Sequence, residues 1–306
     1  MSSGAVRRAA ARAAEEERMA RLRAIRSAPV LTVGKTCKPA ELTSNWEKRV
    51  VVAHSPMGTI AACHLASLRH NLQIAKTAHR WLFDTYDVVL GDFNATHGAM
   101  LDVSVAGTTH DHATMPSYLP APSYSVAAWP PSFDQIVVRR PLQVALADAQ
   151  LWKLQKVREM PRKQMWSHCI PSDHVPVEAV VRGVAAADEL RVATWNVADP
   201  WYYNKYHDNT KTAAEGFERK FEDQRCNLVL QTVDTLVERN QVVALQEVPR
   251  MLVQGVVLAA NTRGLVVGGM PTPARNDELR SSAPYLMLIV DPRAGIELSG
   301  EALGED

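Results

Sequence analysis

The stretch DVVLGDFN at residues 87–94 joins a run of apolar, β-branched residues to a glycine, an aspartate and an asparagine. That composition predicts a buried strand that delivers polar side chains to the edge of a sheet. Further runs of the same kind recur along the chain; they lie at 49–54, 58–65, 134–139, 175–182, 189–197, 241–248 and 285–291. Together they predict one large sheet system.

Helices are predicted between some of these strands. Residues 66–86 and 213–240 repeat apolar residues at three- and four-residue spacing, which is the pattern of an amphipathic helix. The SPMG sequence at 55–58 predicts a hairpin connection, and the segments 115–132 and 268–284 are rich in residues typical of surface loops. The alternation of strands and helices indicates an α/β fold.

The overall composition excludes several classes of protein. A chain of 306 residues with 46% hydrophobic residues can bury a substantial core and needs no disulfide framework in order to fold. Its four cysteines, at 37, 63, 169 and 226, form no CxxC pair, which favours a reducing, intracellular compartment, either the cytoplasm or the nucleus. No run of about 18 uncharged apolar residues is present, so no membrane span is predicted.

Two basic segments stand out although the formal net charge is only +1. Residues 1–26 are rich in alanine, arginine and glutamate; they predict a solvated helix ahead of the main domain, which is a candidate docking element. The alternative is a mitochondrial targeting peptide, but the glutamates at 15–17 disfavour it because such peptides are poor in acidic residues. Residues 153–163 would either form a solvated helix or follow a phosphate backbone.

Polar residues suited to divalent-metal chemistry lie at the ends of the predicted strands. Oxygen donors of this kind bind Mg²⁺ or Mn²⁺ rather than zinc, and Mg²⁺ uses one or two carboxylates while it keeps several waters. Each residue taken singly would usually be a solvated cap or turn, so the prediction depends on the whole set. The set comprises Asp92 and Asn94 in VVLGDFN, Asp134 in SFDQIVV, Asp173 and His174 in PSDHVPV, Asn196 in ATWNV and Glu247 in VVALQEV.

As a set, the motifs WN, LQEV, HL, GDFN, FDQI and SDHVPV resemble the signatures of the endonuclease/exonuclease/phosphatase superfamily, which has the fold of pancreatic deoxyribonuclease. The resemblance covers about residues 27–306. It implies a four-layer α/β/β/α sandwich of two mostly antiparallel sheets, with the functional site at the end where the strand termini converge.

The order of the motifs differs from the family order. In that family the WN and LQE strands open the domain, whereas here they follow the HL, GDFN and SDH motifs. One circularly permuted domain explains this, with 27–182 as the family's C-terminal half, 190–306 as its N-terminal half and GVAAADE at 183–189 as the bridge. The alternative is the back half of one domain joined to the front half of another. Each motif occurs once, which favours the single permuted domain.

The resemblance also implies roles for individual residues. Glu247 corresponds to the primary Mg²⁺ ligand, with Asn196 and Asp173 beside it. Asp92 would orient or deprotonate the attacking water, and Asn94 would hold that water or a phosphate oxygen. Asn196 and Glu247 must then lie within a few ångströms of Asp92 and His174, although more than 100 residues separate Asp92 from Asn196.

Two histidines complete the site that the resemblance implies. His174, steered by Asp134, would transfer a proton or stabilise charge on the phosphorane. His64 would donate a hydrogen bond to a non-bridging phosphate oxygen. Which group is the general base is left open.

The expected function is Mg²⁺-dependent hydrolysis of phosphate esters in nucleic acid. RNA is the favoured substrate because IPSDHVPV looks most like the deadenylase and nocturnin branch of the family. A phosphatase acting on a small phosphorylated molecule is the alternative enzyme, which the near-zero net charge supports. A third hypothesis is a catalytically inactive family fold that serves as a structural or interaction subunit. No membrane partner is expected.

Three further groups of residues carry weaker predictions. The HDH triplet at 110–112 is interpreted as part of a solvated loop rather than as a metal site. The aromatic residues at 201–203 would either stack on bases or pack within a loop. The Arg-Asn pair at 275–276 belongs to a predicted loop that would approach the site.

Overall fold

The computed structural model describes part of the chain, with gaps between the described stretches. The described residues are 49–65, 81–94, 110–114, 133–147, 172, 174–185, 188–197, 215–271 and 284–299. Several predictions fall outside these residues; they concern the N-terminal helix at 1–26, the loop at 115–132, the basic segment at 153–163, Asp173, the aromatic residues at 201–203 and the pair at 275–276.

Within the described residues, twelve strands form two sheets of six. The first sheet has the order β12-β1-β2-β3-β5-β4 and the second has the order β10-β11-β9-β8-β7-β6. The strands of the first sheet are β1 (Arg49–Ser55), β2 (Gly58–His64), β3 (Val88–Asp92), β4 (His110–Thr114), β5 (Asp134–Arg139) and β12 (Glu297–Ser299). Those of the second are β6 (Gln143–Leu146), β7 (Val177–Arg182), β8 (Glu189–Asn196), β9 (Val242–Val248), β10 (Val266–Pro271) and β11 (Tyr285–Val290).

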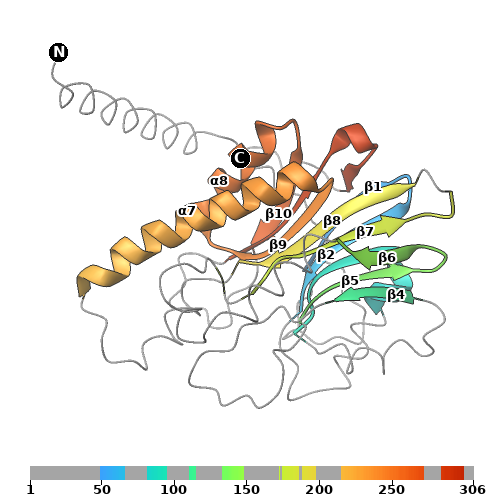
Figure 1. Ribbon diagram of the computed structural model, residues 1–306, viewed down its shortest axis with the longest axis horizontal. Helices are drawn as coiled ribbons and strands as arrows, with labels where there is room; N and C mark the ends of the chain where they lie inside the picture. The colour runs from blue at the N-terminus through green and yellow to red at the C-terminus, as the bar shows by residue number, and fades with distance from the viewer. Residues whose placement is uncertain are drawn as a thin grey trace.

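Each sheet contains one parallel pair of neighbours, β2 with β3 and β8 with β9. The other neighbouring strands are antiparallel. Figure 1 shows how the two sheets lie together, with helices on the side of the second sheet. The prediction of an α/β fold with two mostly antiparallel sheets is therefore confirmed, and SPMG at 55–58 forms the predicted hairpin connection between β1 and β2.

The alternation of side chains along the strands builds the core between the sheets. In β3, Val88 and Leu90 belong to the core that both sheets share, whereas Val89 packs on the outer side with Phe83 from a short helical segment at 81–85. Full burial of a valine or leucine stabilises the fold by about 1.5–3 kcal/mol. The rows of such residues on the two facing sheets therefore hold the sandwich together.

Two helices cover the outer face of the second sheet (Figure 1). The first, α7 (Glu215–Arg239), confirms the helix predicted within 213–240. The second, α8 (Arg250–Asn261), has no counterpart among the predicted elements. Its buried residues form one wide face, and the opposite face carries the exposed residues Arg250, Met251 and Asn261, so the helix is amphipathic; no side chain caps its first turn.

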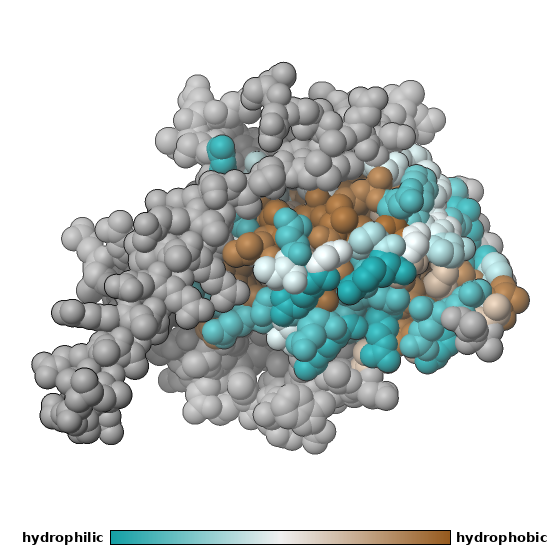
Figure 2. Space-filling model, turned by 90° about the horizontal axis from the view of Figure 1, so that it is seen from above, coloured by the Kyte–Doolittle hydropathy of each residue, from teal (hydrophilic) through white to brown (hydrophobic). Residues whose placement is uncertain are grey.

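The four-layer arrangement remains a prediction. It requires a second helical layer over the first sheet, and only residues 81–86 of the helix predicted at 66–86 are described, of which 81–85 are helical. Among the described helices, none has the length and apolar character needed to cross a membrane. The face seen from above in Figure 2 combines an apolar area with a border of polar side chains.

Two predictions about loops were wrong. The HDH triplet at 110–112 belongs to β4, which pairs with β5 at the edge of the sheet, and Asp111 Oδ2 accepts a hydrogen bond from the Val144 amide at 2.9 Å. The strand β10 continues to Pro271 and so includes the start of the loop predicted at 268–284, because its glycines pair with β11. The strand predicted at 175–182 is confirmed as β7, which begins two residues later, at Val177.

The first and last described strands lie side by side. β12 pairs antiparallel with β1, with Ser299 opposite Val52. β7 and β8, which follow each other in the sequence, also pair antiparallel, and beyond their paired ends the Gly183 amide donates to the Asp188 carbonyl at 2.8 Å.

Candidate functional site

The candidate site forms where the inner rows of both sheets end. Along a strand every second side chain faces the same side, so the residue two positions beyond an apolar core residue also faces the inter-sheet space. In each row that residue is polar, and it stands at one end of the sandwich. The rows are Ile60, Ala62 and His64; Val88, Leu90 and Asp92; Val138, Ile136 and Asp134; Val192, Thr194 and Asn196; and Val242, Ala244 and Gln246.

Strand pairing aligns three of these polar residues across the first sheet. Asp92 lies opposite His64 on the parallel neighbour β2 and opposite Asp134 on the antiparallel neighbour β5. Directly paired residues in a sheet are close enough for their side chains to interact. The three neighbouring strands therefore place a carboxylate between a histidine and a second carboxylate.

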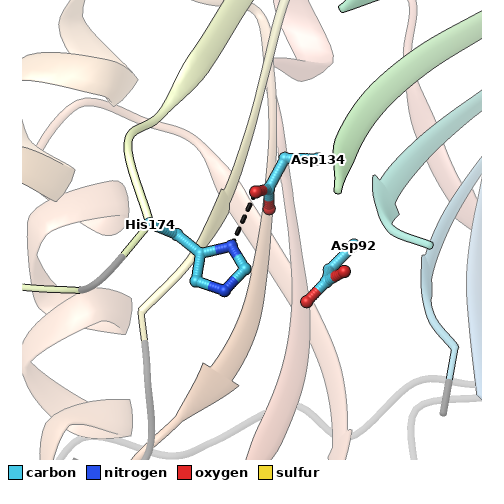
Figure 3. Close-up of side chains that lie close together, drawn as sticks. All are labelled: Asp92, Asp134 and His174. Carbon is cyan, nitrogen blue, oxygen red and sulfur yellow. Dashed lines mark hydrogen bonds and ion pairs between the residues drawn. The ribbon is translucent and has the colours of Figure 1, made fainter. Parts of the chain in front are cut away.

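His174 and Asp134 form a buried pair. The Nδ1 atom of His174 lies 2.6 Å from Asp134 Oδ2, and the side chains are 8% and 0% exposed. Figure 3 shows the imidazole bound to Asp134 through one nitrogen, with the Asp92 carboxylate facing the ring. An N–H donated to a carboxylate fixes the orientation of the ring and leaves Nε2 as the nitrogen for other chemistry.

Asp92 is held by donors from two different parts of the chain. Asn196 Nδ2 donates to Asp92 Oδ2 at 2.8 Å, although the two residues are 104 positions apart in the sequence. The Asn94 amide donates to Asp92 Oδ1 at 2.7 Å. The predicted proximity of Asn196 and Asp92 is thus confirmed. The carboxylate of Asp92 is fixed from the second sheet and from its own turn.

Asn94 lies in a turn directly after β3. Its backbone has φ 48, in the left-handed region, so the extended conformation of the strand ends before this residue. Its side-chain Nδ2 donates to the Leu65 carbonyl at 2.6 Å. Asn94 therefore anchors the turn after β3 to the turn after β2, and one of its donors is committed there.

His64 and Glu247 are the more accessible members of the group. His64 Nε2 lies 3.4 Å from Glu247 Oε1 and 3.9 Å from Asp92 Oδ2. The side chains of His64 and Glu247 are 17% and 14% exposed, compared with 2% for Asp92. Solvent or a ligand would therefore reach the buried carboxylates from the side of His64 and Glu247.

A β-bulge turns Glu247 toward the site. Leu245 and Val248 both pack on the outer face with the helices, so simple alternation would send Glu247 outward with Leu245. Instead, two residues of β9, Gln246 and Glu247, stand opposite the single residue Leu286 of β11. Glu247 has a φ of 53, a backbone conformation that residues other than glycine rarely adopt. Backbone strain at this position is thus coupled to the placement of a carboxylate.

This strain predicts different stabilities for two substitutions that both remove the carboxylate. Glu247→Gly should be more stable than Glu247→Ala by about 1 kcal/mol, because glycine adopts a positive φ without the cost that a β-carbon imposes. Urea unfolding of the two variants gives the difference directly. Equal stabilities, or a less stable glycine variant, would show that Glu247 is not strained.

The electrostatics of the site are dominated by buried carboxylates. Burial raises the pKa of Asp92 above its usual range, and the nearby charge of Asp134 raises it further, whereas His174, His64 and the hydrogen bond from Asn196 lower it. Buried charges are costly unless they are compensated. Asp92, Asp134 and Glu247 therefore create an environment that favours a bound cation.

Asp92, Asp134 and His174 form a buried group that could hold a metal ion. Their potential ligand atoms all lie within 4.8 Å of one another. Of the predicted site residues, the structure brings together seven; these are His64, Asp92, Asn94, Asp134, His174, Asn196 and Glu247. Asp173, the remaining predicted ligand, lies outside the described residues.

Two buried polar residues beside the site had no role in the sequence-based prediction. Gln246 Nε2 donates to Thr194 Oγ1 at 3.1 Å, which links β9 to β8 below the site. Ser172 is fully buried and contacts the backbone at Asn196. Ser172 lies within the PSDHVPV motif that the sequence analysis identified, but the sequence does not show that its side chain is buried.

Comparisons with protein-family models, curated proteins and solved structures find no match for the chain.

Proposed function

We propose that this chain is a metal-dependent phosphoric ester hydrolase that cleaves phosphodiesters in nucleic acid, with RNA as the favoured substrate. The observation that carries the proposal is the convergence of the Asp134–His174 pair and the Asn196–Asp92 pair at one end of two packed sheets. An oriented histidine beside hydrogen-bonded carboxylates is suited to proton transfer and to cation binding. The resemblance to the endonuclease/exonuclease/phosphatase superfamily and its four-layer fold belongs to the same proposal.

The arrangement of the strands supports one permuted domain over 27–306. The segment 27–182 supplies β6 and β7 to the second sheet, and the segment 190–306 supplies β12 to the first. Each segment therefore completes the sheet of the other, which two independent half-domains would not need to do. Because β12 lies beside β1, a hairpin between them would restore the family order once the chain was opened at the β7–β8 turn.

The donor set fits a hard divalent cation such as Mg²⁺ or Mn²⁺. Glu247 and Asn196 would hold the ion together with Asp173, and the excess of buried carboxylates would be neutralised. When bound, the ion supplies charge neutralisation on the phosphate and lowers the pKa of a coordinated water.

The protein residues then divide the proton transfers between them. Asp92 is the proton acceptor, since its raised pKa makes it a better base than an ordinary aspartate. The water oxygen forms its bond to phosphorus as Asp92 takes the proton, and the ester P–O bond breaks as the Nε2–H of protonated His174 protonates the departing oxygen. The proton on Asp92 returns to His174 through solvent. His64 donates to a non-bridging oxygen, where negative charge develops.

The proposal is tested by hydrolysis of a substrate panel. The panel contains single-stranded RNA with a poly(A) tail, duplex DNA, abasic DNA and an inositol phosphate, each with Mg²⁺ or with EDTA. We expect cleavage of the RNA when Mg²⁺ is present and no cleavage when EDTA is present. Glu247→Ala should lower the rate by about 100-fold or more, because even residues that support metal ligands cost about 10- to 100-fold. Glu238→Ala, at an exposed position of α7, is the matched control.

The other outcomes of this panel select the alternatives. Hydrolysis of the inositol phosphate alone, with little dependence on salt, would favour a small-molecule phosphatase, because cleavage of a polyanion should fall steeply as salt rises. No hydrolysis by a folded protein that also fails to bind Mg²⁺ would favour an inactive structural or interaction subunit.

A further inference from the structure

Ser172 links the two hydrogen-bonded pairs of the proposed active site. Its side chain is fully buried. The Ser172 hydroxyl donates to the Asn196 carbonyl at 2.7 Å and accepts from the His174 amide at 3.0 Å. Asn196 in turn holds Asp92, and His174 is bound to Asp134. One hydroxyl therefore connects the backbone of Asn196, which belongs to the first pair, with the backbone of His174, which belongs to the second.

A second contact runs between the same two segments in the opposite direction. Trp195 Nε1 donates to the His174 carbonyl at 3.0 Å, and the indole is itself fully buried. The backbone amide of His174 is thus bonded by the Ser172 hydroxyl, and its carbonyl by the Trp195 side chain near the end of β8. These contacts fix the backbone of His174 in relation to Asn196.

We infer that Ser172 is a positioning residue that sets the spacing between the Asp134–His174 pair and the Asn196–Asp92 pair. The consequence for catalysis rests on the proposed function, whereas the effect on the geometry of His174 does not. Removal of the hydroxyl takes a buried partner from both the Asn196 carbonyl and the His174 amide. Because buried polar groups require partners, the two segments would shift to find new ones.

The chain provides a matched control for this serine. Ser55, in the turn between β1 and β2, donates to the Gly58 carbonyl at 2.9 Å and accepts from the Met57 amide at 3.2 Å. This is the same combination of contacts, with an acceptance from the amide two residues later. Ser55 lies at the end of β1 and β2 opposite to His64. Ser55→Ala therefore removes a hydroxyl with the same contacts, half-buried rather than buried, far from the proposed site.

The experiment compares Ser172→Ala, Ser55→Ala and wild type in full-length protein labelled with ¹⁵N-histidine. The ring-nitrogen shifts of His174, assigned with His174→Gln, report the hydrogen bond to Asp134 without any need for catalysis. We expect these shifts to change in Ser172→Ala and to stay in place in Ser55→Ala. The kcat of Ser172→Ala on the hydrolysed substrate should fall by about 10- to 100-fold with little change in KM. Ser172→Thr, which keeps the hydroxyl, should restore the wild-type shifts.

Failure of this inference is distinguishable from failure of the proposed function. Unchanged His174 shifts in Ser172→Ala would overturn the positioning role even if the enzyme were active. Changed shifts in a protein that hydrolyses no substrate would support the positioning role and reject the hydrolase. If Ser172→Ala does not fold, Ser172→Cys replaces the hydroxyl with a thiol, which is only a weak donor and acceptor of hydrogen bonds. The shifts of His174 should then change in Ser172→Cys, and unchanged shifts would again overturn the inference.

Discussion

Asp134→Asn should lower kcat for phosphodiester hydrolysis by about 100- to 10,000-fold, the range that general acid–base groups contribute. Asp134 is fully buried and lies 2.6 Å from His174 Nδ1, so its carboxylate both orients the ring and stabilises the imidazolium. Asparagine keeps the size of the side chain and removes the charge. The measurement is kcat with saturating Mg²⁺, together with KM, which should change little.

The control for this substitution is Asp188→Asn, an exposed carboxylate in the turn between β7 and β8. It should leave kcat at the wild-type value. Wild-type kcat in folded Asp134→Asn would contradict the assignment of His174 as the group that protonates the departing oxygen.

Asp92→Asn should lower kcat by about 100- to 10,000-fold as well. The same substitution should nevertheless stabilise the folded protein when EDTA removes divalent ions. The pKa of Asp92 is raised by burial and then by Asp134, so the folded state binds this proton more strongly than the unfolded state does. Stability contributed by the protonated form is therefore lost as pH rises through the folded pKa. Asparagine has no charge to lose, so the gain in stability should grow from acid to neutral pH.

Thermal unfolding of wild type and Asp92→Asn between about pH 4 and about pH 8 measures this difference. We expect the two melting temperatures to approach each other toward the acid end, because unfolded wild-type Asp92 also begins to take up its proton there. Asp188→Asn should show no such trend. A wild-type protein that is more stable than Asp92→Asn in EDTA at neutral pH would contradict the prediction.

The strands and much of the site could be predicted from the sequence because both depend on local alternation. The apolar positions of VVLGDFN and VVALQEV mark buried strands, and the polar residues that follow them are visible without a structure. The contact between Asn196 and Asp92 does not depend on local alternation. That contact depends on the packing of two sheets and was predicted only through the resemblance to a family.

Other features depend on tertiary contacts that the sequence pattern does not show. The close approach of α8 to α7 requires Gly255, since a β-carbon there would lie 2.8 Å from Leu230 Cδ2. The HDH triplet at 110–112 looks like a polar loop, but pairing with β5 makes it an edge strand. The bulge at Glu247 needs the register of β11, and the role of Ser172 needs its burial.

The pairing of β12 with β1 also has a consequence for how the chain folds. Ser299 must find Val52, which lies near the start of the described residues, so this contact spans almost the whole described chain. Closing such a long loop costs conformational entropy before the contacts between the two strands can offset that cost. The hairpins β1–β2 and β7–β8 are local and should form early, whereas the strand that joins the two ends should dock late. A folding intermediate that lacks β12 would expose the edge of β1, and that edge is the place where association with another copy should begin during refolding.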